Sequence, residues 1–202
     1  LWWVSHPSRL IAIEPTRFVL FHTTVELFAV VVAMLVFMTG YSAMLSKRKG
    51  AVVWLAVAFF GVGLLDALHL MSYAGMPDAL TPNSPQKSIF FWLAARMLAA
   101  ISLLVYALLP AVPEVSRTYK SVALAFMLRV CGVLAYVVLL EADQLPPMFG
   151  HGQGLTPLKI GLEWLVVALN LLTLAAFWRR RDALAGECLM ALNSAVALSA
   201  VS

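Results

Sequence analysis

Two pairs of ionisable residues interrupt apolar stretches of this sequence. His22 and Glu26 lie four positions apart in FHTTVELF (21–28), and Asp66 and His69 lie three positions apart. In a helix, either spacing places both side chains on one face. Imidazole and carboxylate groups bind metal ions, and two histidines on neighbouring helices can ligate a haem iron. The pairs therefore predict a metal or haem site, with His22, His69, Glu26 and Asp66 as the metal ligands. An organic ligand such as a quinone, or protons titrating the histidines, are the alternatives.

The segments that carry these pairs are long enough to cross a membrane. The chain is 62% hydrophobic and 12% charged, with a mean hydropathy of +0.91, whereas soluble domains are about half apolar and about a quarter charged. A membrane span needs roughly 20 apolar residues, and continuous apolar runs exclude the alternating strands of a barrel. We therefore predict an all-α polytopic transmembrane bundle that forms a single domain over residues 1–202. Its six helices are expected at residues 17–45, 51–73, 88–109, 121–140, 157–178 and 183–202.

Three further ionisable residues lie at a similar depth in these predicted helices. A helix rises about 1.5 Å per residue, which places His22 and Glu26 about 6–12 Å below the outer end of the first helix. The same count places Asp66, His69, Arg96, Lys159 and Glu163 in this outer layer. A charge at the bilayer centre costs at least ~2.5–3.5 kcal/mol, so these groups are expected to face one another rather than lipid. The predicted ligand-binding residues are His22, Glu26, Asp66, His69, Arg96, Lys159 and Glu163. Arg129, near mid-depth, is not assigned to this layer. Polar residues that only join helices within the bundle are the simpler interpretation.

The loops predict the orientation of the bundle. Loops 46–50, 117–120 and 179–181 carry eight Lys and Arg residues, against four on the opposite side. By the positive-inside rule these three loops are cytoplasmic, and the segment before residue 17 is outside. The predicted ligand-binding residues then lie in the outer half of the membrane.

Other functional classes fit the sequence less well. The basic residues form short clusters between apolar runs, which indicates a role in orientation and predicts no nucleic-acid partner. Neither H-E-x-x-H nor G-x-S-x-G occurs, so intramembrane hydrolysis is not favoured. A small transporter, or an ion- or proton-conducting bundle, would use the same intramembrane residues and is the alternative function. The internal repeats and broken helices typical of transporters are not evident. A purely structural subunit is a third hypothesis.

Four stretches together resemble a known family. They are FHTTVELF (21–28), GVGLLDALHLMSYAGM (61–76), FWLAARML (91–98) and GQGLTPLKIGLEW (152–164). In this order and spacing they resemble the third type of bacterial membrane-associated sensor domain, of the MASE class. The residues that carry the resemblance are His22, Thr23, Glu26, Asp66, His69, Tyr73, Trp92, Arg96, Thr156, Pro157, Lys159 and Glu163.

The resemblance implies a sensory input module of the bacterial inner (cytoplasmic) membrane, in contact with the lipid bilayer and joined to its own cytoplasmic output domain. Outputs of such proteins include diguanylate cyclases, phosphodiesterases and histidine kinases, which implies cyclic di-GMP or two-component signalling. The segment itself is then not an enzyme, and a homodimer is the expected assembly. In such domains a helix precedes the FHT motif and a polar helix follows at the other end. We therefore expect seven or eight helices in the full domain, and cytoplasmic termini when there are eight.

Overall fold

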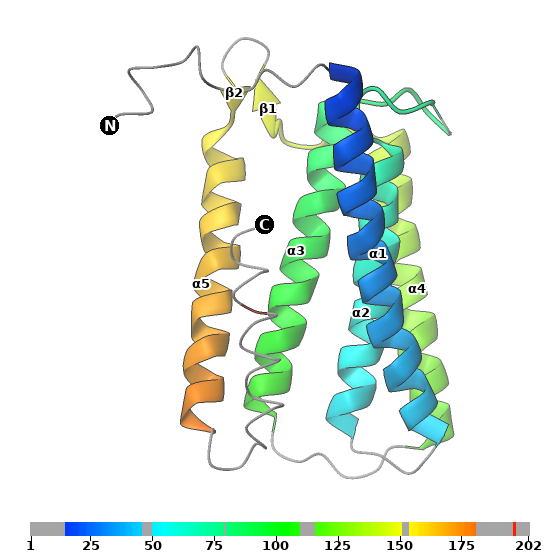
Figure 1. The fold of residues 1–202 in the computed structure, drawn as a ribbon, viewed down its shortest axis with the longest axis vertical. Coiled ribbons are helices and arrows are strands. Elements are labelled where there is room, and N and C mark those ends of the chain that lie inside the picture. Colours follow the sequence, from blue (N-terminus) through cyan, green and yellow to red (C-terminus); the bar gives the residue numbers. More distant parts are fainter. Residues whose placement is uncertain are drawn as a thin grey trace.

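The computed structural model describes residues 15–45, 50–78, 80–109, 116–150, 154–180 and 196. Long antiparallel helices dominate these residues (Figure 1). They are α1 (Pro15–Leu45), α2 (Gly50–Met71), α3 (Pro85–Leu108), α4 (Arg117–Leu140) and α5 (Pro157–Arg179). The connection from α4 to α5 holds a short 3-10 helix, η2 (Ala142–Gln144), and the antiparallel strands β1 (Phe149–Gly150) and β2 (Gly154–Leu155). The predicted polytopic helical bundle is confirmed.

All five helices described are long and apolar enough to span a membrane, with candidate spans of 21 to 24 residues and mean hydropathies of 1.9 to 2.4. Large apolar side chains cover much of their outer surfaces; Phe28, Phe126 and Leu171, for example, are all exposed. In a soluble protein such surfaces would be unfavourable, whereas lipid tails accommodate them. The chain is therefore a multi-span membrane protein in contact with the lipid bilayer.

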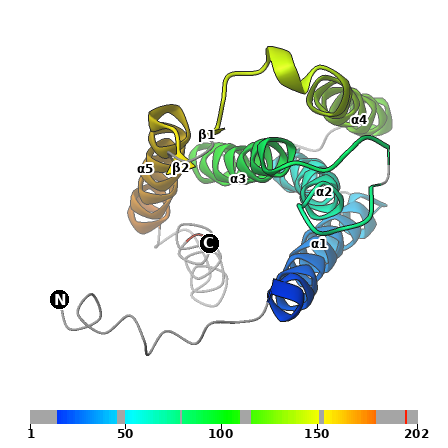
Figure 2. The ribbon, with the colours of Figure 1, turned by 90° about the horizontal axis from the view of Figure 1, so that it is seen from above.

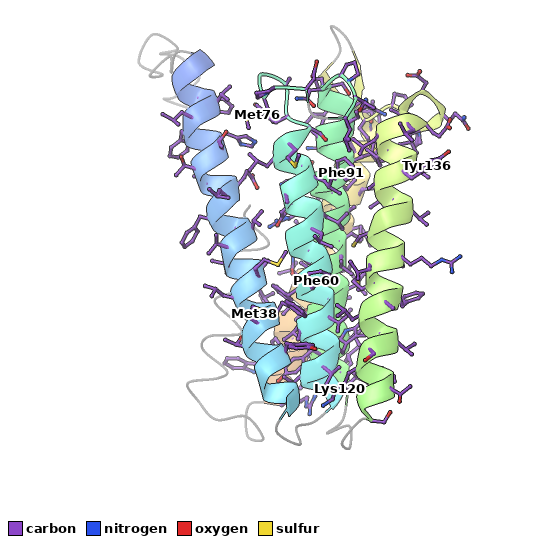
Figure 3. The ribbon with its side chains drawn as sticks, turned by 90° about the vertical axis from the view of Figure 1, so that its right-hand side faces the viewer. Met38, Phe60, Met76, Phe91, Lys120 and Tyr136 are labelled. Atoms are coloured by element: carbon purple, nitrogen blue, oxygen red, sulfur yellow. The ribbon has the colours of Figure 1, made fainter. Side chains whose placement is uncertain are left out.

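The two ends of the bundle differ in the residues that they carry. Helices α1, α3 and α5 begin at one end, which we call the polar end, and finish at the other, which we call the basic end (Figure 1). Figure 3 shows Met76 at the polar end and Lys120 at the basic end. Arg179 and Arg180 also lie at the basic end, because α5 finishes there.

The core of the bundle is centred on α2 and α3. Of the residues in the most apolar part of each span, 56% are buried in α2 and 44% in α3, but only 6% in α1. Viewed from above, α5, α3, α2 and α1 follow one another in a row, and α4 flanks α2 and α3 (Figure 2). Glycines allow close approach between helices. A Cβ atom on Gly61 of α2 would lie 2.6 Å from Met127 Sδ of α4, and one on Gly40 of α1 would overlap Ala56 Cβ of α2. Helix α1 therefore packs mainly against α2 and leaves most of its surface to lipid.

Several helix bounds differ from the sequence prediction. Helix α3 begins three residues earlier than predicted, because the Ser84 side chain caps it and Pro85 occupies its first turn. Ser116 caps α4 in the same way, so that helix begins at Arg117 rather than at residue 121. The predicted start of the fifth helix at residue 157 is confirmed, with Thr156 as the cap and Pro157 in the first turn of α5. The sixth predicted helix, at residues 183–202, lies outside the described residues apart from Val196 and stays a prediction.

Candidate functional site

Three side chains from α1 and α2 converge at the polar end. His22 and Glu26 lie one helical turn apart on α1, and His69 lies near the end of α2. One donor atom from each of the three lies within 4.8 Å of the other two. His69 is buried and the other two are partly buried. Together these residues form what we call the triad, His22, Glu26 and His69, and an imidazole, imidazole and carboxylate set is a typical metal-binding combination.

Helix α3 holds the His69 ring in place. His69 Nδ1 lies 2.8 Å from the Ser88 carbonyl oxygen and 3.0 Å from Ser88 Oγ. Because a carbonyl oxygen only accepts hydrogen bonds, Nδ1 carries a proton and donates it to Ser88. In the neutral ring the lone pair is then on Nε2, which lies 3.7 Å from Glu26 Oε1. In metal-ligating histidines, a hydrogen bond donated by the other ring nitrogen fixes the tautomer in this way.

Two nitrogen atoms of the triad lack hydrogen-bond partners. His22 Nε2 and His69 Nε2 are both buried and unpaired within the described part of the chain. Leaving a buried polar atom unpaired costs about 1–3 kcal/mol, and the 3.7 Å separation from Glu26 exceeds a hydrogen bond. A ligand placed between the three side chains would satisfy both nitrogens.

Aromatic and turn residues enclose the triad. The His22 ring centroid lies 4.1 Å from that of Tyr73 and 5.5 Å from that of His69. Just beyond Tyr73, Gly75 has φ of +104°, a conformation that favours glycine and turns the chain back over α1. There Thr23 Oγ1 donates a hydrogen bond to Met76 Sδ at 3.6 Å. This turn covers α1 close to the triad and ties the two helices together.

Asp66 and Arg96 form a buried ion pair beside the triad. Arg96 Nη2 donates to Asp66 Oδ1 at 2.8 Å and to Oδ2 at 2.7 Å, which joins α2 to α3. The Asp66 side chain is only 1% exposed and that of Arg96 is 14% exposed. Both oxygens of Asp66 are engaged by the guanidinium, so this predicted metal ligand is placed with Arg96 rather than with the histidines. Glu26 also interacts electrostatically with Arg96, which links the ion pair to the triad.

The other two predicted site residues lie elsewhere. Lys159 donates to Glu163 one turn along α5, and its Nζ lies 5.3 Å from the centre of the Trp92 ring. Helix α5 packs on the side of α3 away from α1 (Figure 2). The structure therefore brings five of the seven predicted residues together and places Lys159 and Glu163 in a separate contact between α3 and α5. Arg129, which the sequence left unassigned, is exposed on α4.

Sequence reasoning missed Ser88 as part of this site. The predicted helix began at this residue, and nothing in its type or its spacing from His69 indicates a contact across 19 positions. Tyr73 belonged to the resemblance but was not assigned to the site, although an aromatic ring one turn beyond His69 could have been placed on the same face.

Comparison with known proteins gives one match. A sequence model of a family described as a membrane-associated sensor domain, MASE3, matches residues 13–202. No curated protein and no solved structure matches the chain.

Proposed function

Because the chain belongs to the MASE3 family of membrane-associated sensor domains, we propose that the triad is the cue-binding site of this sensory module and that the cue is a divalent transition-metal ion. The proposal rests on the convergence of one donor atom from each of the three side chains. It also rests on two buried nitrogens, His22 Nε2 and His69 Nε2, that have no partner in the described residues. The proposal extends to orientation: the polar end faces outward and the basic end faces the cytoplasm, by the positive-inside rule.

The two imidazoles and one carboxylate favour zinc or another divalent metal that prefers nitrogen and oxygen ligands. Zinc sites that keep one open position use three protein ligands, and histidine nitrogens and carboxylate oxygens bind at about 2.0–2.2 Å. Ligands at the corners of such a tetrahedron lie about 3.4 Å apart, whereas the triad donors lie within 4.8 Å of one another. Because Glu26 Oε1 already lies 3.7 Å from His69 Nε2, binding would draw α1 toward α2 by at most about 1 Å. The open fourth position would take water, as expected for an exchangeable ion.

A single ion suits the triad better than haem does. Haem ligation would place the two imidazoles on opposite sides of a macrocycle. Here a Glu26 oxygen lies within 4.8 Å of a donor nitrogen on each ring, and Tyr73 packs 4.1 Å from the His22 ring. The space between the histidines is thus lined by a carboxylate and shaped for a small cation.

The signal would pass through helix packing. A ligand shifts a two-state equilibrium only by its differential affinity for the two states. Metal binding favours the packing in which α1 lies closer to α2, and the His69–Ser88 hydrogen bond connects that change to α3. We propose that a cytoplasmic output domain, such as a diguanylate cyclase or a histidine kinase, responds to this repacking in a homodimer.

Metal analysis of the purified protein tests the proposal. The detergent-purified protein is stripped with chelator, titrated with Zn²⁺ and Co²⁺, and assayed by elemental analysis and absorption spectroscopy. We expect about one metal per chain and visible Co²⁺ bands, both lost in His22→Ala, His69→Ala and Glu26→Gln. Glu163→Gln is the matched control, because it removes the same charge on α5, and it should retain the metal.

Other outcomes would contradict the proposal in distinct ways. A protein that takes up no metal would overturn it, and a Soret band lost in both histidine variants would replace the ion by haem. Metal uptake into proteoliposomes would instead support the transport hypothesis.

A further inference from the structure

A cavity at the basic end lies between α3 and α5, far from the triad. It has a volume of about 370 Å³, and Leu104, Leu108, Leu172 and Ala175 form much of its wall. Two guanidinium groups, those of Arg179 and Arg180, also line it. The volume is within the range of small-ligand sites, which extends from about 300 to 1,000 Å³. Apolar walls combined with positive charge predict an amphipathic, anionic ligand.

The two arginines have different surroundings. Arg180 Nη1 donates to the carbonyl oxygens of Ala107 and Leu109, each at 2.8 Å. These contacts stabilise the negative end of α3 and fix the guanidinium at the cavity. A guanidinium has five N–H donors, and in the part of the chain that the structure describes only those on Nη1 are used, which leaves Nη2 and Nε for a ligand. Arg179 is exposed and makes no ion pair within the described residues.

The cavity is accessible from the lipid phase at the end of the spans. Leu108 and Leu172 in its wall are 65% and 57% exposed, and neighbouring Trp178 is 65% exposed. Exposed tryptophan at the end of a membrane helix is typical of the headgroup region. A ligand here would have its charged group level with the lipid headgroups and its apolar part beside α3 and α5.

From this combination we propose that the cavity binds an anionic phospholipid, with its acyl chain along Leu108 and Leu172 and its phosphate at Arg179 and Arg180. Basic pockets between membrane helices on the cytoplasmic side bind anionic headgroups in this manner. The site is independent of the triad, which lies at the other end of the bundle. It would make the packing of α5 on α3 depend on the lipid composition of the membrane.

Native mass spectrometry in detergent tests the proposal with defined probes. The purified protein is titrated with dioctanoyl phosphatidylglycerol, with dioctanoyl phosphatidylcholine and with glycerol 3-phosphate. Phosphatidylglycerol should bind at least fivefold more tightly than phosphatidylcholine, and Arg179→Gln should remove about fivefold of its affinity. Lys120→Gln removes a charge at the same end on α4 and should leave both lipids unaffected.

A second pair of variants tests the apolar part of the site. Ala175→Phe fills the cavity without changing the charge and should weaken both lipids, whereas Ala125→Phe, at an exposed alanine of α4, should not. Both alanines are exposed, so neither substitution disturbs the core. Equal affinity for the two lipids, or no effect of Arg179→Gln and Ala175→Phe, would overturn the proposal. Glycerol 3-phosphate binding as tightly as phosphatidylglycerol would show that the occupant is a soluble phosphate and not a lipid.

Discussion

Replacement of Arg96 by methionine should destabilise the protein more than any other single change at the polar end. The Asp66 side chain is 1% exposed, and both of its oxygens accept hydrogen bonds from Arg96 Nη2. Hydrogen bonds to charged groups contribute about 1.5–3 kcal/mol each, and breaking a buried ion pair by removing one partner costs about 3–5 kcal/mol. We therefore expect Arg96→Met to lower the free energy of unfolding by about 3–5 kcal/mol.

The reverse change and the double change should cost less. Asp66→Leu leaves Arg96, whose side chain is 14% exposed against 1% for Asp66, so the charge left behind is less deeply buried. The double variant Asp66→Leu with Arg96→Met leaves no buried charge, and exchange of a buried pair for apolar residues is often neutral or stabilising. The wild type and the double variant should have similar free energies of unfolding, the highest of the four proteins. Asp66→Leu should be less stable, and Arg96→Met should be the least stable.

Reversible unfolding in mixed micelles measures this order. The denaturant is an increasing fraction of dodecyl sulfate, and circular dichroism reports the loss of helix. Lys159→Met is the control. Lys159 is itself 10% exposed, but the carboxylate that the change leaves behind, Glu163, is on the same helix and 33% exposed. Loss of this pair and of the contact with the Trp92 ring should cost about 1 kcal/mol. A loss below about 1 kcal/mol for Arg96→Met, or a double variant as unstable as that single variant, would refute the view that the pair locks α2 to α3.

Two further predictions concern helix packing and use the same unfolding assay. Gly40→Ala should destabilise by about 1–3 kcal/mol, because its Cβ would overlap Ala56 Cβ, which cannot rotate away. Gly132→Ala, with nothing within 4 Å, should be neutral or stabilising by up to about 1 kcal/mol. Equal effects would contradict the close packing of α1 on α2. Arg129→Leu should leave stability unchanged or increase it, because Arg129 is exposed on an apolar span; a loss above about 1 kcal/mol would indicate that Arg129 has a partner outside the described residues.

The sequence predicted the parts of the site that depend on helix geometry. The spacing of His22 and Glu26 predicted a shared face, and the helix rise placed His69 at a similar depth. Depth does not reveal which helices are neighbours, so Lys159 was grouped with residues that lie on the other side of α3. Ser88 was missed because its contact with His69 depends on the backbone of α3, whose start at Pro85 follows from the Ser84 cap.

The position of the triad on α1 determines what kind of movement metal binding can produce. Helix α1 packs tightly on α2 at Gly40 and Ala56, about 27 Å along the helix from His22. A displacement of about 1 Å at His22, pivoting there, rotates α1 by about 2° and moves its end at Leu45 by only about 0.3 Å. Rigid rotation of α1 would therefore cause almost no displacement at the basic end. Because α2 and α3 are joined by the Asp66–Arg96 pair, the change is instead absorbed in how α1 packs along α2. If the triad binds a metal as proposed, the signal would therefore be a shift between two packings of the bundle rather than a large displacement of one helix.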